Sequence, residues 1–223
     1  MFRYLGWGIS LLLATAALLS CTDSGTNPEP IPVLVPLAVG NEWAYVERYI
    51  YCKGTQYSEE FDTIRIVSDT VIGDETWYRF EGNPIFALVT SRCDGLWEWN
   101  PMTACTPCNK FHYPTDIGDQ WSIGVELSFT IELVSEGAVV TVPAGTFVCG
   151  HYRMTADGYS FPYYFDLFFC PGAGLVKWDH HICNCETDTG LACTSRYWSL
   201  VSVSASSAIP YVQPCWPQGF DIR

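Results

Sequence analysis

The feature that most restricts the fold of this chain is an alternation of apolar and polar residues between Trp121 and Leu133. Every odd-numbered residue of this stretch is apolar, and every even-numbered residue is polar or glycine. A period of two predicts a β-strand with one buried and one solvated face. Because a strand from Trp121 to Leu133 is unusually long, we expect it to bend, and Gly124 is the expected place.

Turn signals recur along the rest of the chain at the spacing of short strands. Gly73-Asp74, Asp94-Gly95 and Asp157-Gly158 each separate two strand-like runs, and Pro143 to Gly145 separates two more. Each predicts an antiparallel hairpin. No sustained helical period follows the N-terminal segment. We therefore predict an all-β fold of about ten to twelve strands, an antiparallel up-and-down meander curled into a barrel or half-barrel, with a β-sandwich as the alternative.

The N-terminus predicts export and lipid anchoring. Arg3 precedes an apolar run from Ile9 to Leu19, which is too short to span a bilayer and is typical of a signal peptide. The sequence Leu-Leu-Ser-Cys ending at Cys21 resembles the lipobox of bacterial lipoproteins, which implies acylation of Cys21, palmitate included, and cleavage before it. An ordinary signal peptide is the alternative.

These signals divide the chain into three parts. Residues 1–20 are predicted to be the lipoprotein signal peptide, residues 21–33 the lipid anchor and a flexible proline-rich tether, and residues 34–223 a single all-β domain. Thr22, the residue after the anchor, favours the outer membrane by the sorting rule of enteric lipoproteins. We expect an extracytoplasmic protein of the cell envelope, held to the membrane by its N-terminal lipid.

The charge of the chain argues against nucleic acid as a partner. The formal net charge is −13, and the predicted signal peptide removes only Arg3 among the charged residues. Binding to phosphate backbones needs clustered lysine and arginine. We therefore expect no nucleic-acid partner.

Cysteines predict that the domain is braced by disulfides. Once Cys21 is lipidated, an even number remains in a chain that faces an oxidising compartment. The disulfide candidates are Cys52, Cys93, Cys105, Cys108, Cys149, Cys170, Cys183, Cys185, Cys193 and Cys215. Their connectivity cannot be deduced from sequence. Two segments that we predict to be loops, residues 100–116 and 179–193, hold half of these cysteines.

Three short stretches, in this order, suggest a family. They are "PLAVGNEWAY" (Pro36 to Tyr45), "VPAGTF" (Val142 to Phe147) and "PGAGLVKW" (Pro171 to Trp178). The chain resembles a loose group of uncharacterised bacterial lipoproteins and secreted β-rich proteins that share these landmarks. The resemblance implies an exported β-rich protein and no catalytic residues.

Several motifs suggest metal or redox chemistry, and each has a simpler interpretation. In "DHHICNC", His181, Cys183 and Cys185 would share one face of an extended segment and could provide zinc ligands. Their spacing matches no common zinc motif, so we favour disulfides and predict no cofactor. "CTPC" at Cys105 to Cys108 resembles a redox motif without its helix, and we favour a structural bridge. "ETDTG" lacks the acids of a calcium loop, and a solvated turn is favoured.

Aromatic residues provide the candidate ligand site. Trp97 and Trp99 alternate on one predicted strand and would share a face, where they could stack on a sugar or hold an apolar ligand. Packing in the core is the alternative for the aromatic residues as a class. Motifs for hydrolytic catalysis, GxSxG and HExxH, are absent from the sequence, so we predict no enzyme.

The predicted function is therefore a binding or structural role in the envelope. The alternative is a glycan- or lipid-binding module that uses exposed aromatics, and the third is an enzyme with an unrecognised site. A deep apolar pocket beneath Trp97 and Trp99 would favour ligand binding, whereas histidine and carboxylates converging in a cleft would favour an enzyme.

Overall fold

The structure is a computed structural model that describes residues 31–50, 57–82, 86–99, 107–124, 128–159, 163–187, 190–204 and 211–212. Its strands are β1 (Ile31–Pro32), β2 (Glu42–Ile50), β3 (Tyr57–Ile72), β4 (Glu75–Glu81), β5 (Leu88–Arg92), β6 (Gly95–Glu98), β7 (Cys108–His112), β8 (Gln120–Ile123), β9 (Phe129–Val142), β10 (Gly145–Ala156), β11 (Tyr163–Cys170), β12 (Gly174–Thr187), β13 (Gly190–Ser204) and β14 (Tyr211–Val212). The described residues contain no helix.

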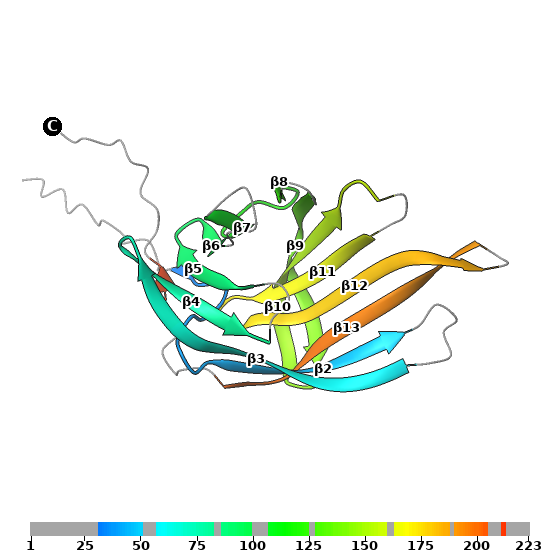
Figure 1. The fold of residues 1–223 in the computed structure, drawn as a ribbon, viewed down its shortest axis with the longest axis horizontal. Coiled ribbons are helices and arrows are strands. Elements are labelled where there is room, and N and C mark those ends of the chain that lie inside the picture. The colour runs from blue at the N-terminus through cyan, green and yellow to red at the C-terminus, as the bar shows by residue number, and fades with distance from the viewer. Residues whose placement is uncertain are drawn as a thin grey trace, which may run out of the picture.

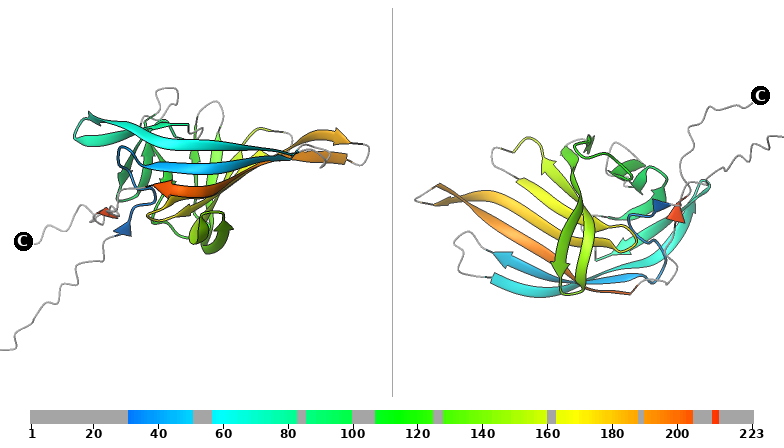
Figure 2. Two further views of the ribbon diagram at one scale, coloured as in Figure 1. Left: turned by 90° about the horizontal axis from the view of Figure 1, so that it is seen from below. Right: turned by 180° about the vertical axis from the view of Figure 1, so that it is seen from behind.

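Twelve of these strands form one antiparallel sheet. Its order is β7-β6-β5-β4-β3-β2-β13-β12-β11-β10-β9-β8, so almost every strand pairs with its neighbours in sequence. The exception is the pairing of β2 with β13, which joins the two halves of the chain. The sheet curls until it is a nearly closed barrel, with β7 and β8 as its two edges (Figures 1 and 2). The prediction of an all-β meander curled into a barrel is confirmed, and the β-sandwich alternative is wrong.

Local turn chemistry accounts for the hairpins. Gly73 and Gly145 both have positive φ angles, of 65° and 139°, which glycine adopts without the strain that a Cβ would bring. Gly95 at the start of β6 also has a positive φ, and a Cβ there would lie 2.0 Å from the carbonyl oxygen of Phe111. Alanine at Gly95 would therefore push β7 away from β6.

Aromatic side chains are prominent in the interior of the barrel. Trp43, Tyr45, Trp77, Phe111, Tyr152, Phe169 and Trp198 are among the largest fully buried side chains. Phe111 lies near the centre, with its ring centroid 4.9 Å from that of Phe169 and 5.6 Å from that of Tyr152. Since aromatic side chains bury a large apolar area per residue, they contribute strongly to the hydrophobic stabilisation of the sheet.

Two predictions about individual segments are wrong. The stretch from Trp121 to Leu133 is not one bent strand but the pair β8 and β9, which run antiparallel with Trp121 opposite Ile131. Gly124, at φ 94°, marks the end of β8. The segment 179–193, predicted to be a loop, lies largely within β12 and β13. Within 100–116, residues 108–112 form β7.

Candidate functional site

The two edges of the sheet meet at a seam, defined here as β7, β8 and the connecting residues 113–119. Main-chain pairing does not join β7 to β8. Instead, the indole Nε1 of Trp121 donates to the carbonyl oxygen of Lys110 at 3.1 Å, and the Tyr152 hydroxyl donates to the carbonyl oxygen of His112 at 3.1 Å. Side chains therefore close the barrel here.

A cleft opens at this seam, with a volume of about 660 Å³. It lies between the β5–β6 turn, the β6 and β7 strands, the seam connection and one residue of β9. Its lining residues are Asp94, Trp97, Asn109, His112, Pro114, Thr115, Asp116, Asp119 and Glu136. The cleft is thus built from segments that are distant in sequence, where the sheet edges come together.

Trp97 provides the indole of the cleft wall. Its Nε1 donates to the Asp94 carboxylate at 2.8 Å, and the Arg92 guanidinium lies over the ring at 4.0 Å from the centroid. Arg92 is in turn held by two contacts of 2.6 Å to the carboxylate of Glu75. The ring is therefore fixed in place while Trp97 remains partly exposed to the cleft.

His112 lies beside the carboxylates of the cleft. Its ring stacks on Trp121 with centroids 4.2 Å apart and planes 6° apart. Burial lowers the pKa of His112 below its ordinary value, while Asp94 and Asp119 act in the opposite direction. A neutral imidazole both donates and accepts hydrogen bonds, so His112 suits a ligand with hydroxyl groups.

The floor and rim of the cleft offer acceptors rather than cations. Asp119 accepts hydrogen bonds from the Thr115 hydroxyl at 2.9 Å and the Asp116 amide at 3.2 Å, which orders the seam connection. Asn109 Oδ1 is buried and has no hydrogen-bond partner, although Asn109 Nδ2 donates to the Asp94 carbonyl oxygen at 3.0 Å. None of the lining residues is lysine or arginine. The cleft therefore favours ligands that donate hydrogen bonds over ligands that carry negative charge.

Trp99 does not share this cleft. It lies just beyond β6 and lines a second pocket of about 400 Å³ with Ser68, Asp69, Thr70, Arg79, Ala87 and Leu88. The Trp99 ring packs edge-on against Trp77, at 5.6 Å between centroids. Trp97 and Trp99 therefore line different pockets, and ligand binding by either of them stays a prediction.

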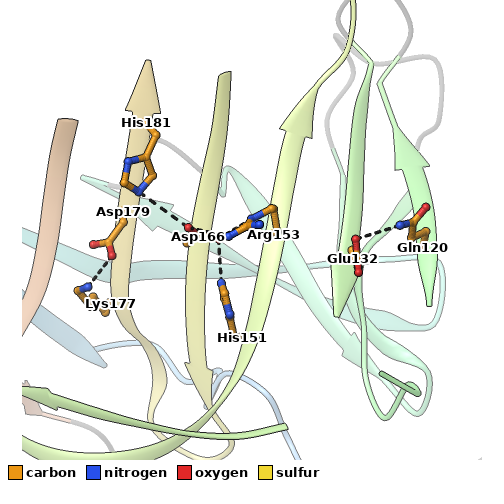
Figure 3. Close-up of polar contacts among 8 residues, drawn as sticks. All are labelled: Gln120, Glu132, His151, Arg153, Asp166, Lys177, Asp179 and His181. Atoms are coloured by element: carbon orange, nitrogen blue, oxygen red, sulfur yellow. Dashed lines mark hydrogen bonds and ion pairs between the residues drawn. The ribbon is translucent and has the colours of Figure 1, made fainter. Parts of the chain in front are cut away.

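A second polar cluster lies on the outer face of the sheet, over β10, β11 and β12 (Figure 3). Asp166 of β11 accepts contacts from His151 at 2.8 Å, Arg153 at 2.9 Å and, more distantly, His181 at 3.8 Å. On the next strand, Lys177 lies 2.5 Å from Asp179. Figure 3 also shows Gln120 bonded to Glu132 at 2.9 Å, between β8 and β9.

The two aspartates of this outer cluster are opposite one another in the β11–β12 register. Burial acts to raise the pKa of Asp166, but the hydrogen bonds from His151 and Arg153 outweigh it, and the pKa falls below its ordinary value. Burial raises the pKa of Asp179, and Lys177 opposes this only in part. Aromatic rings cover both cations, with Arg153 over Tyr164 and Lys177 over Phe168. The contacts of Asp166 link β10, β11 and β12 across this face of the sheet.

The two histidines of the "DHH" sequence lie on opposite faces of β12. His181 faces outward to Asp166, and His180 faces the inner side, stacked on Phe165 at 4.3 Å between centroids. The side chains of Cys183 and Cys185 lie outside the described residues, so the zinc alternative is not tested on them. Among described side chains, no three histidine, cysteine or acidic groups are placed to hold a metal ion.

The cysteines do not all behave as predicted. Cys93 and Cys108 are each disulfide-bonded, whereas Cys149 and Cys170 are free thiols in the structure. Cys21, Cys52, Cys105 and Cys215 lie outside the described residues, as do the side chains of Cys183, Cys185 and Cys193.

Sequence reasoning identified Trp97 but missed its partners. Asp94 was noted only as a turn residue, and His112, Asp119 and Glu136 had no motif to mark them. A weak signal existed, because the segment from His112 to Asp119 holds a histidine, prolyl and hydroxyl residues and two acids within eight positions.

Comparisons with known proteins give little more. No family model matches this sequence, and no curated protein matches it. Among solved structures, a "putative lipoprotein" from Parabacteroides distasonis ATCC 8503 is 13% identical, with a TM-score of 0.38, and covers 79% of this chain and 100% of its own. A "putative exported protein with YmcC-like fold" from Bacteroides fragilis NCTC 9343 is 12% identical, with a TM-score of 0.41 and the same coverage. These scores are too low to assign a family or a function.

Across the described residues, no helix is long and apolar enough to cross a membrane.

Proposed function

We propose that this chain is a lipid-anchored, extracytoplasmic envelope protein whose seam cleft binds a neutral or amine-bearing glycan. The anchor and the compartment rest on the sequence, namely the apolar run before Cys21 and the proline-rich tether after it. The glycan rests on the structure of the cleft. Of the functions predicted from sequence, this proposal favours the glycan-binding module over a purely structural role.

The observation that carries the proposal is the composition of the cleft. A fixed, partly exposed indole lies beside four carboxylates, an amide and a neutral imidazole, with no lining cation. Sugars present apolar C–H faces that pack on aromatic rings and hydroxyl groups that donate to carboxylates. Both kinds of contact are available within one cleft of about 660 Å³, a size typical of small-ligand sites.

The same composition argues against other ligands. A phosphate or uronic acid would meet uncompensated repulsion from Asp94, Asp116, Asp119 and Glu136. A lipid tail would have to bury those carboxylates without hydrogen bonds, which is costly. An amino sugar gains from both its hydroxyl groups and its positive charge.

A second candidate, hydrolysis of the bound glycan, is favoured by one observation. His112 lies close enough to Asp94 and Asp119 for both carboxylates to affect its pKa, and general acid–base catalysis needs such convergent groups. Asp94 and Asp119 are exposed and already accept hydrogen bonds from Trp97 and Thr115, so we favour binding.

Titration calorimetry on the detergent-solubilised full chain tests the proposal. Oligomers of glucosamine and of glucose are the cationic and neutral probes, and oligogalacturonate is the anionic probe. We expect binding of one or both of the first two, with Trp97→Ala weakening it at least about tenfold, equivalent to roughly 1.4 kcal/mol. Trp99→Ala, in the other pocket, is the matched control and should bind as the unchanged protein does.

Two results would count against it. Failure of both non-anionic probes, or binding that Trp97→Ala leaves intact, removes the cleft as the glycan site. Shortened oligomers after incubation, seen by chromatography, would favour the hydrolase instead.

The anchor has its own test. Cys21→Ser should move the protein from the membrane fraction to the soluble fraction and abolish incorporation of labelled palmitate. Lipid labelling that persists in this variant would refute the anchor and leave the glycan proposal untouched.

A further inference from the structure

Two thiols lie opposite one another where strands β10 and β11 are paired. Gly150 is the register partner of Phe169 at the end of the β10–β11 pairing, and continuing this register by one residue places Cys149 opposite Cys170. Directly opposed residues of antiparallel strands have Cα atoms about 4.5 to 5.5 Å apart. Disulfides accept Cα separations of about 4.4 to 6.8 Å. The register alone therefore places these cysteines within bonding range.

The side chains use this proximity. The Cys149 and Cys170 thiols are close enough to affect one another's pKa, and the Cys170 thiol donates to the Pro171 carbonyl oxygen at 3.8 Å. Cys149 is fully buried in the core, and Cys170 is partly exposed at the end of β11. Only one of the two sulfurs is therefore accessible to a reagent from solution.

The two thiols also differ in acidity. The hydrogen bond from Cys149 lowers the pKa of Cys170 to about 7, although burial opposes this effect. The same contact and burial raise the pKa of Cys149. Because the thiolate is the nucleophile in disulfide exchange, the accessible sulfur is also the more reactive one.

We propose that Cys149 and Cys170 are a cross-strand redox pair that closes to a disulfide through exchange with an external disulfide. This assigns one specific connection among the many possible for the cysteines of this chain. It goes beyond the glycan site, and its chemistry does not depend on what the cleft binds.

The proposed thiol–disulfide exchange takes place in two steps. The Cys170 thiolate attacks one sulfur of the external disulfide, forming a mixed disulfide and releasing the other sulfur as a thiolate. The Cys149 thiol then loses its proton and attacks the Cys170 sulfur, which forms the protein disulfide and releases the second external thiolate. The protein dithiol is oxidised by two electrons, and the external disulfide is reduced to two thiols.

The location gives the bond a structural role. Cys149 lies where the pairing of β10 with β9 shifts register, and Cys170 interacts electrostatically with Tyr113 of the seam connection. A covalent link here would fix β10 to β11 behind the seam, where the barrel is closed by side chains rather than by strand pairing.

The test is peptide mapping of the purified full chain. Trypsin cuts after Lys110, Arg153 and Lys177, so Cys149 and Cys170 fall in adjacent peptides, each with no other cysteine. The chain is treated with oxidised glutathione, unfolded, alkylated with iodoacetamide and digested. We expect the two peptides to be joined to each other, with loss of two hydrogens and no alkyl group on either.

Single variants give a second readout. In Cys149→Ser the resolving thiol is absent, so Cys170 should retain one glutathione; in Cys170→Ser the buried Cys149 should react at least about tenfold more slowly in the folded protein. Alkylation of both cysteines after oxidation of the unchanged chain would overturn the proposal. Linkage of either peptide to a different cysteine would overturn it as well.

Discussion

Replacement of His180 should make the fold less sensitive to mild acid. His180 faces the inner side of β12, where its ring lies 4.3 Å from Phe165 and 5.2 Å from Tyr163, and the cation Arg196 is its register partner on β13. Its Nε2 is buried without a hydrogen-bond partner. Burial, and then the neighbouring His181, lower the pKa of His180 from 6.5 to about 4.

The direction of the pH dependence follows from which state, folded or unfolded, binds more protons at His180. An unfolded chain binds a proton at His180 below about pH 6.5, whereas the folded chain binds it only below about pH 4. Between these values the unfolded state holds more protons, so stability falls as the pH falls through this window. Below the folded pKa the loss is complete and grows no further.

The stability lost through protonation of His180 has an upper bound of about 3 kcal/mol. This bound follows because the pKa of His180 is lowered by roughly 2.5 pKa units, at about 1.36 kcal/mol each. His180 is only partly buried, so solvent screening reduces this, and we expect about 1 to 2 kcal/mol. His180→Phe should preserve the aromatic packing and remove this contribution.

Urea unfolding at about pH 7 and pH 4 measures the contribution of His180 to the loss of stability in acid. The stability lost between the two pH values should be smaller in His180→Phe by about 1 to 2 kcal/mol. His181→Gln, on the opposite face of β12, is the control and should retain the larger part of the His180 contribution, which comes from burial. An equal loss in His180→Phe and the unchanged protein, or an NMR titration midpoint of His180 near 6.5, would refute the reasoning.

Three further substitutions probe the core and the charge pairs. Phe169→Ala, at the centre of the aromatic core, should cost about 3 to 5 kcal/mol in urea unfolding, whereas Val139→Ala on the surface should cost under about 0.5 kcal/mol. Lys110→Met leaves the buried Glu98 carboxylate, 2.8 Å away, without its cation and should cost about 3 to 5 kcal/mol; adding Glu98→Leu should recover most of it. The lowered pKa of Asp166 stabilises the fold above about pH 4, and this stabilisation is lost as the pH falls through the folded pKa. Asp166→Asn should therefore lower the free energy of unfolding at neutral pH and make it less dependent on pH in acid. An unchanged pH dependence of stability in acid would contradict this prediction.

The hairpins were predictable because their signals are local. Gly73 and Gly145 can adopt positive φ angles without strain, and the sequence around each alternates as a strand should. The order of strands followed, since short turns force neighbours in sequence to pair.

The errors arose where one pattern fits two structures. An alternation from Trp121 to Leu133 is the same for one bent strand and for a hairpin that reverses after Gly124, since both leave the odd-numbered side chains on the inner face. In the segment 179–193, cysteine, threonine and asparagine suggested a loop, but pairing with β13 overrides that composition.

The cleft was unpredictable for a different reason. It exists only where β7 and β8, at the two edges of the sheet, are brought together by its full curvature. No local signal in the sequence encodes that meeting, and His112 and Asp119 acquire a shared environment only when the barrel closes.

The sequence landmarks have a structural explanation that separates them from the cleft. Trp43, in the first landmark, donates through Nε1 to the Ala173 carbonyl oxygen in the third at 2.7 Å, and the Tyr45 hydroxyl donates to the Leu175 carbonyl oxygen at 2.7 Å. A Cβ at Gly174 would lie 3.3 Å from Trp43 Nε1, which is tight enough to disturb this joint. The second landmark forms the β9–β10 hairpin, where the Ala144 amide donates to the Leu200 carbonyl oxygen at 3.0 Å. Residues that hold strands together can be shared among chains with different ligands, and no residue lining the cleft belongs to a landmark. In this chain the three landmarks therefore contribute to how the sheet is assembled, and they lie apart from the seam cleft.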